Sequence, residues 1–518
     1  MSTRPDVVVA GAGHNSLVAA AYLAKAGFRV LVLEARPVVG GNTATEELTL
    51  PGFLHDSCST AHNLIQTSPA VSELRLEEYG LEYIRPDPVV HVAFGDGASI
   101  TQWRDLDRTC DELARFSRRD ADAYGRLIAD YDAVKGAFGA YRNNPVGRAP
   151  RPDEVLDGRW RRRLTSSAWD VIRAEFEDWH VRAFMLWMAV MTVQPADRPG
   201  TGVLAYSLVY GRQQHSWTLP RGGSAALPLA LAHLIEEHDG TILCDRRVSG
   251  LVLENGRCVG VETDDGERHL ASRAVVSTVH PAHLLGMAPR EAWGDDWTHT
   301  ADTWREGICL FPTHLATTVA PAYPVEGGEL APVASGIAPS VDRLLRLGSD
   351  VERGLLADDD PVLLVVCATV ADPSRAPEER HVLKVIGFHP YALADGGAER
   401  WDEVKDEVAR RNVEQLRRFA PNLTEETILA EVVKSPLDLE RVNPHNWHGT
   451  CHGGDHGPSQ SGANRFAPVT PIAGLFQTGA TTHPGGSVSA APGRNTAIVV
   501  LEALGRSLDE AIGADARA

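Results

Sequence analysis

The order of apolar and polar residues near the N-terminus predicts two strands joined by a helix. Residues 7–10 form an uninterrupted apolar run, which is typical of a strand buried on both faces of a parallel sheet. The alanine-rich stretch 16–26 has a helical pattern and is followed by Gly27, a residue type that commonly ends helices. Residues 29–33, which are apolar after Arg29, form the second strand. The chain therefore opens with a β-α-β unit of an α/β fold.

Residues 221–279 carry a second group of elements. Two adjacent glycines precede an amphipathic helix that extends to about His238. Strands at 248–254 and 257–263 are expected to pair through an Asn-Gly turn. The apolar run 274–279 is able to rejoin the parallel sheet.

The remaining patterns divide between a third such group and two mixed segments. Strand 475–478 is followed by a Pro-Gly-Gly turn and a helix to about Leu504. Elsewhere, 107–138 and 401–419 have helical patterns, and 361–370 is a strand-like apolar run. A second GxGxxG after a strand is missing from these mixed segments, so we expect no separate NAD(P)H domain. Electrons are then expected to leave to oxygen, a quinone or a carrier protein.

Composition narrows the class of protein. The 518 residues suffice for two intertwined domains, and the formal net charge of −19 argues against binding to nucleic acid or anionic lipid. Neither a transmembrane run nor a secretory signal pattern is present. The seven scattered cysteines include no CxxC and no CxxxxC pair beside the nucleotide loop. They predict reduced thiols in a cytoplasmic protein and exclude the disulfide reductases.

The β-α-β unit has the spacing of a dinucleotide-binding site. Gly11 and Gly13 make the tight turn that lets backbone approach a pyrophosphate at the helix N-terminus. Glu34 ends the second strand, where an acidic side chain accepts ribose hydroxyls. Ser16 replaces the third glycine of GxGxxG, and serine is small enough for close packing of helix and strand.

A second glycine turn decides between NAD and FAD. Gly40 and Gly41 follow the ribose acid closely, which marks flavoproteins with two dinucleotide-binding domains, so FAD is expected. The helix after the Pro-Gly-Gly turn should direct its positive end at the flavin N1–C2=O edge, which favours hydride acceptance at N5. In related folds the residue at the position of Val248 meets the adenine with its backbone, and an ordinary sheet valine is the alternative. The predicted cofactor residues are Gly11, Gly13, His14, Asn15, Ser16, Glu34, Ala35, Arg36, Gly40, Gly41, Asn42, Val248, Gly479, Ala480, Pro484, Gly485, Gly486, Ser487 and Val488.

Three stretches resemble a known family: VVVAGAGHNSLVAAAYLAKAGFRVLVLEARPVVGGN, RGGSAALPLAL and TTHPGGSVSAAPGRN. They are similar to the phytoene desaturase/dehydrogenase-like flavoproteins, in particular the soluble branch typified by pyridine nucleotide-disulfide oxidoreductase domain-containing protein 2. The resemblance implies noncovalent FAD, a monoamine-oxidase-like two-domain fold, and desaturation or isomerisation of hydrophobic substrates. We assign 1–79, 220–296 and 464–518 to a Rossmann-like FAD-binding domain, and 80–219 and 297–463 to a discontinuous α+β substrate domain.

Histidines supply the candidate acid/base groups. His62 lies in a segment that returns near the flavin ring in this fold class, where it could take a proton as hydride leaves. In the family, a glycine-rich NP…GG segment lies across the substrate cavity, which makes His445, His448 and His452 candidates. His483, before the Pro-Gly-Gly turn, is another. A hydrogen-bonded structural histidine is the alternative for each.

The stretch NPHNWHGTCHGGDHG, residues 443–457, also has histidine spacings found in zinc sites. Its proline and glycines make a continuous helix implausible, so we expect no metal and interpret it as a glycine loop over a flavin pocket. Met185, Met188 and Met191 have helical spacing, which fits either a core helix or a flexible wall of the substrate cavity.

Together the features predict an FAD-dependent dehydrogenase, or desaturase, that transfers hydride from a largely apolar small molecule to flavin N5. A histidine or water would take the accompanying proton. The alternatives are a flavin amine oxidase, which would need aromatic residues flanking the flavin, a flavin-dependent isomerase, and a non-enzymatic flavin-bearing interaction protein. Whether the chain forms a homo-oligomer stays open.

Overall fold

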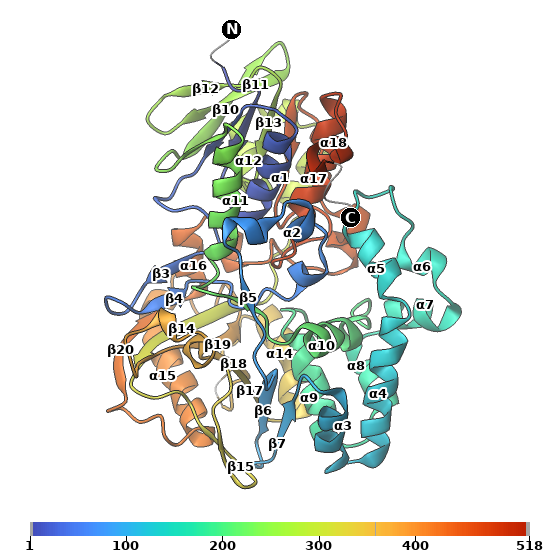
Figure 1. Cartoon of the computed structure of the whole chain (residues 1–518), viewed down its shortest axis with the longest axis vertical. Helices are drawn as coiled ribbons and strands as arrows, with labels where there is room; N and C mark the ends of the chain where they lie inside the picture. The colour runs from blue at the N-terminus through green and yellow to red at the C-terminus, as the bar shows by residue number, and fades with distance from the viewer. Residues whose placement is uncertain (1–3, 358, 514–518) are drawn as a thin grey trace.

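A parallel sheet forms the first half of the computed structural model, which describes residues 4–357 and 359–513. The sheet lies in the upper part of Figure 1 and has the strand order β21-β13-β1-β2-β9. All four pairings are parallel. The strands come from three separate chain segments: β1 (Val7–Ala10), β2 (Val30–Leu33), β9 (Thr241–Leu243), β13 (Ala274–Ser277) and β21 (Leu475–Gln477).

The side chains of β1 alternate between two apolar layers. Val7 and Val9 pack in the core that includes residues of three helices, α1 (His14–Lys25), α11 (Ala226–Glu237) and α17 (Ala491–Ala503). Val8 and Ala10 belong to the core on the other face, together with Val261 of the antiparallel sheet β10 (Val248–Glu254), β11 (Arg257–Thr263) and β12 (Arg268–Leu270). Burial on both faces explains why β1 carries no polar residue.

Most of these elements agree with the prediction. β1, β10 and β11 have the predicted bounds, and the Asn-Gly turn has positive φ at both residues, as a type I′ turn requires. The sequence suggested that α17 follows the Pro-Gly-Gly turn directly, and this prediction is wrong. Ser487 and Ala490, with φ of 86° and 60°, interrupt the helical backbone before it. The pattern also gave no sign of β9, which has only three residues.

A seven-stranded sheet forms the second half, below the first in Figure 1. Its order is β20-β14-β19-β18-β17-β6-β7, and only β6 and β17 are parallel neighbours. One face packs on α15 (Trp401–Phe419), and the opposite core includes α9 (Trp179–Val190) and α10 (Leu204–His215). The strands are β6 (Val90–Phe94), β7 (Ser99–Gln102), β14 (Cys309–Thr317), β17 (Ala334–Ala338), β18 (Leu363–Val366), β19 (His381–His389) and β20 (Ile428–Val433).

Two predicted elements of this half are corrected. The helical pattern 107–138 is three helices, α3 (Leu106–Ala114), α4 (Arg118–Asp132) and α5 (Lys135–Arg142). The hydroxyl of Ser117 caps α4 and so separates it from α3. The apolar run 361–370 contains only the four residues of β18 and then a 3₁₀ turn. The prediction for 401–419 is confirmed by α15.

Shorter elements complete the fold. The helices are α2 (Ala70–Glu73), α6 (Pro152–Val155), α7 (Gly158–Thr165), α8 (Ala168–Glu175), α12 (Pro281–Leu284), α13 (Asp295–Asp302), α14 (Val341–Glu352), α16 (Pro436–Val442) and α18 (Leu508–Ile512). The strands are β3 (Thr45–Glu47), β4 (Leu54–Asp56), β5 (Tyr83–Ile84), β8 (Leu219–Pro220), β15 (Tyr323–Val325) and β16 (Gly328–Leu330). Within the described residues, none of the helices combines the length and apolar character needed to span a bilayer.

The two halves are joined near residues 80 and 220. At this point β5 and β8 pair as a short antiparallel ribbon. We propose that the domain boundaries lie as the sequence suggested, with 1–79, 220–296 and 464–518 around the parallel sheet. Segments 80–219 and 297–463 then form the second domain.

Candidate functional site

A cavity of about 850 Å³ is lined by residues from both sheets. This volume lies in the upper range of small-molecule sites. Its walls include the turns that follow β1, β2 and β21, residues 58–61, 63 and 64, the segment after α9, one face of α10, and part of 443–456. All the predicted cofactor residues except Ser16 and Gly485 line it.

The turn after β1 has no room for a side chain. Gly11 has a φ of +94°, and a Cβ atom there would lie 2.4 Å from Cγ2 of Thr278. The following helix, α1, begins at His14 with no side-chain cap and no acidic residue in its first turn. Its first backbone N–H groups are therefore suited to an anion such as a pyrophosphate.

Glu34 lies beside the turn after β1, at the same end of the cavity. One carboxylate oxygen accepts a hydrogen bond from the backbone N–H of Ala12 at 2.7 Å, and the other accepts from Arg36 N–H at 2.9 Å. These bonds hold the carboxylate at the carboxyl ends of β1 and β2. It is the position at which a ribose hydroxyl is accepted in dinucleotide sites.

Ser16 and Gly485 act behind the cavity wall. The Ser16 hydroxyl lies within hydrogen-bond distance of the carbonyl oxygens of Gly11, at 2.6 Å, and Gly13, at 2.9 Å. The serine thus stabilises the first turn from behind the cavity wall. A Cβ on Gly485 would lie 2.4 Å from the ring of His456, so this glycine makes room for a histidine of the 443–457 loop.

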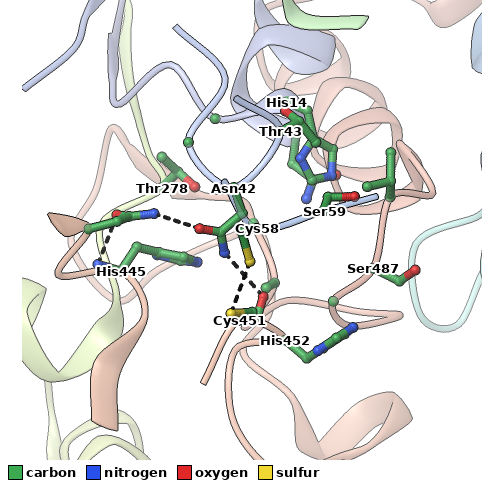
Figure 2. A pocket seen from close by; sticks show the side chains of 18 of the residues that line it. His14, Asn42, Thr43, Cys58, Ser59, Thr278, His445, Cys451, His452 and Ser487 are labelled. Atoms are coloured by element: carbon green, nitrogen blue, oxygen red, sulfur yellow. Dashed lines mark hydrogen bonds between the residues drawn. The ribbon is translucent and has the colours of Figure 1, made fainter. Parts of the chain in front are cut away.

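The second glycine turn is tied to that loop by amide side chains. Nδ2 of Asn42 donates to Oδ1 of Asn446 at 2.6 Å, and Nδ2 of Asn443 donates to Oδ1 of Asn42 at 3.1 Å. Figure 2 shows Asn42 between His445 and Cys451, which both belong to the loop. Because about 400 residues separate the partners, the loop and the turn form one wall only in the folded chain.

Two of the predicted catalytic histidines line the cavity, His445 and His452. Burial lowers the pKa of each to about 4, so both rings are neutral at neutral pH. Neither ring nitrogen of His452 has a hydrogen-bond partner among the described residues, and its ring is exposed to the cavity in Figure 2. His452 is therefore able to accept a proton there.

The other three predicted histidines do not line the cavity. Both ring nitrogens of His62 have partners, Tyr83 Oη at 3.2 Å and Ser224 Oγ at 3.1 Å. His448 stacks on Trp447 and Tyr391 at the surface, and Nε2 of His483 bonds to the carbonyl of Tyr141. These contacts hold the three rings outside the cavity lining.

Cys58, Cys451 and His456 also lie on the cavity wall, although the sequence did not predict them as site residues. Sγ of Cys58 donates to Sγ of Cys451 at 3.1 Å, and Figure 2 shows the sulfur atoms facing each other. This contact lowers the pKa of Cys58 and raises that of Cys451, so Cys58 is the thiol of the pair that loses its proton first. Spacing could not pair residues 393 positions apart.

The opposite end of the cavity is built from side chains of the second half. α10 contributes Leu204, Ser207, Leu208 and Arg212, which share one helical face, and Met191 follows α9. The seven-stranded sheet adds Leu310, Leu364 and Ile386. Met191 is thus a wall residue, whereas Met185 and Met188 are core residues, so each interpretation holds for part of the methionine stretch.

The charges on the cavity wall are unbalanced. Among the described lining residues Glu34 is the one carboxylate, whereas Arg36, Arg142, Arg212, Arg246 and Arg247 supply guanidinium groups. Trp217 is the one aromatic side chain apart from the histidines. The site therefore suits anionic and apolar groups.

The residues present fit FAD. The crowded Gly11 turn, the uncapped start of α1 and the carboxylate of Glu34 provide the features that a dinucleotide needs. By contrast, no group of three or more His, Cys, Asp or Glu side chains converges on a metal position in the part of the chain that is described.

Known proteins are similar to this chain in sequence. The family model for flavin containing amine oxidoreductase matches residues 17–493. One of the limonene dehydrogenase subunits from Castellaniella defragrans is 27% identical, over 98% of this chain and 97% of that protein. Pyridine nucleotide-disulfide oxidoreductase domain-containing protein 2 of Mus musculus is also 27% identical, over 96% and 94%.

A solved structure agrees in fold. A triple mutant of putrescine oxidase, made to redesign cofactor binding, has a TM-score of 0.64 at 16% identity and covers 97% of this chain and 99% of that one. The predicted family resemblance, the fold class and the FAD cofactor are confirmed by these similarities.

Proposed function

This chain belongs to the flavin-containing amine oxidoreductases and is an FAD-dependent oxidoreductase, and on that premise we propose that it dehydrogenates a largely apolar small molecule. One observation carries the proposal: a single cavity runs from the dinucleotide turns to the apolar wall of α10 and the seven-stranded sheet. A relative named limonene dehydrogenase supports an apolar substrate class.

Each end of the cavity has its own task. Bound FAD would accept the two electrons, as hydride at N5 of the flavin ring. Gly11 and the start of α1 would hold the cofactor's phosphates, and Glu34 would hold a ribose. Leu310, Leu364 and Ile386 orient the apolar substrate and exclude water from it.

The accompanying proton goes to a neutral base. His452 is our candidate because its ring lies on the cavity wall and is neutral near pH 7. His445, also on the wall, is the second candidate. A His452→Gln variant should keep its FAD and lose most of its rate of flavin reduction, whereas a normal rate would transfer the role to His445 or to water.

An amine substrate is disfavoured by the wall. A protonated amine at the substrate end would meet the guanidinium of Arg212, and the single lining carboxylate is at the dinucleotide end. The amine oxidase alternative needs aromatic residues beside the flavin. In the described lining, Trp217 is the one aromatic side chain apart from the histidines. A flavin-dependent isomerase differs in returning its electrons to the product.

Anaerobic reduction of the bound flavin tests the proposal. The holoenzyme is mixed with saturated ketones, enoyl compounds, polyenes and amines, and the visible flavin absorbance is followed. Stoichiometric bleaching with a product two hydrogens poorer is the expected result for an apolar compound. Bleaching by amines alone would favour the oxidase, and a product of unchanged mass would favour the isomerase. Readmitting oxygen, then a quinone, identifies the acceptor class.

A further inference from the structure

Arg212 is a buried cation at the apolar end of the cavity. Its side chain is 3% exposed, and its Nε has no hydrogen-bond partner among the described residues. Nη1 lies 2.8 Å from Sδ of Met188, and sulfur is a weak acceptor. The guanidinium also stacks over the ring of Trp217, 4.1 Å from its centroid. Burial lowers the pKa of Arg212 to about 9, so it stays charged at neutral pH.

The other buried arginines of the described chain all have strong oxygen partners. Arg163, Arg343, Arg375 and Arg494 pair with carboxylates at 2.6 to 3.0 Å. Arg465 donates to four backbone carbonyl oxygens. Arg212 alone among these has neither kind of partner. An uncompensated buried charge is costly, so its retention at a cavity wall points to an anion that comes from outside the chain.

The position of Arg212 on its helix indicates what that anion is attached to. Leu204, Leu208 and Arg212 are four residues apart in turn, so they lie along one face of α10. All three line the cavity. From Leu204 to Arg212 the helix rises about 12 Å. A ligand along this face would meet an apolar wall and then a cation.

We propose that Arg212 binds the carboxylate of the substrate, and that the substrate is an apolar carboxylic acid whose body lies along α10. This inference rests on the proposed function and narrows its substrate class. Nε and Nη2 form the edge that binds a carboxylate with two parallel hydrogen bonds. The cofactor's pyrophosphate is served at the other end of the cavity, by the turn at Gly11 and the start of α1.

Direct binding to the holoenzyme tests the assignment without turnover. Decanoate, decan-1-ol and decylamine have equal chain length and differ in charge, and their affinities are measured by calorimetry. Decanoate should bind most tightly. An Arg212→Met variant, with a side chain of similar length, should bind decanoate roughly tenfold to a hundredfold more weakly and decan-1-ol unchanged. Arg212→Lys should lose less decanoate affinity than Arg212→Met, because the charge remains although the paired donors of the guanidinium are lost.

The controls separate the outcomes. Arg346→Met removes an exposed arginine from α14 and should bind decanoate like the wild type. Unchanged decanoate affinity in Arg212→Met would overturn the proposal, and so would loss of FAD from that variant, which would assign the arginine to the cofactor. If neutral compounds bleach the flavin and decanoate does not bind, the dehydrogenase proposal stands and the carboxylate proposal fails.

Discussion

The two ends of the cavity recognise their ligands by different means. At the dinucleotide end the backbone makes the site: Gly11 and Gly40 leave no space for a Cβ atom, α1 begins without a side-chain cap, and one carboxylate is held by backbone N–H groups. At the other end side chains make the site, with an apolar face of α10 that finishes in an unpaired arginine.

This difference determines which substitutions each end tolerates. An added Cβ atom is a clash where the backbone approaches the ligand, whereas a leucine wall adapts to a change of size at the cost of substrate fit. The single lining carboxylate, Glu34, lies at the first end, and the buried guanidinium of Arg212 lies at the second. The following predictions test this contrast.

Gly11→Ala should have the largest effect. The new Cβ would lie 2.4 Å from Cγ2 of Thr278, at a φ of +94° that alanine rarely adopts. We expect the purified protein to lose most of its flavin, measured as absorbance per protein after gel filtration. Adding Thr278→Ser, which deletes the clashing methyl, should restore part of it.

A matched control separates the clash from the backbone strain. Gly27 has a φ of +85° and no atom within 4 Å of its Cβ position. Gly27→Ala should cost about 1 kcal/mol in the free energy of unfolding and keep the flavin. Equal flavin loss in both variants would mean that strain, and not close approach, explains the effect.

Glu34→Gln should have the next largest effect. The amide keeps the side-chain volume but removes the charge that strengthens two hydrogen bonds from backbone N–H groups. FAD affinity of the apoprotein, followed by flavin fluorescence, should fall roughly tenfold. Glu46→Gln, which removes a partner of Arg36 outside the cavity, is the control and should change affinity less.

The same contrast explains what the sequence could predict. The dinucleotide end depends on glycines and an acid whose spacing is local, so β1, α1, Glu34 and the cofactor were all recognisable. The substrate end has no such spacing, because its wall joins α10 to strands more than 90 residues further along. For the same reason His62 looked suitable by position, although its ring bonds to Tyr83 and Ser224, and the contact between Cys58 and Cys451 was invisible.

Acid should weaken the folded state through histidines at the cavity. Burial lowers the pKa of His14, His445 and His452 to about 4, against about 6.5 in the unfolded chain. Between these values the unfolded state binds more protons, so stability falls as pH drops below about 6.5. Each such group contributes roughly 1.4 kcal/mol per pH unit.

Urea unfolding at about pH 7 and about pH 5 measures this loss. His14→Gln should reduce the difference between the two conditions by about 2 kcal/mol, because one titrating group is gone. His299→Gln is the control, since His299 lies on α13 away from the cavity lining. A difference that His14→Gln leaves unchanged would place the acid sensitivity elsewhere in the molecule.

Substitution of Ser16 should have the smallest effect, and it tests whether a side chain contributes at the dinucleotide end. Its hydroxyl bonds to the carbonyls of Gly11 and Gly13 and points away from the cavity lining. Ser16→Ala should therefore lower the free energy of unfolding by about 1 kcal/mol and leave the flavin content unchanged. Ser16→Gly, which restores the usual third glycine, should be less stable still, because glycine within α1 costs about a further 1 kcal/mol. If the glycine variant were the more stable one, the hydrogen bonds from Ser16 to the first turn would not stabilise the fold.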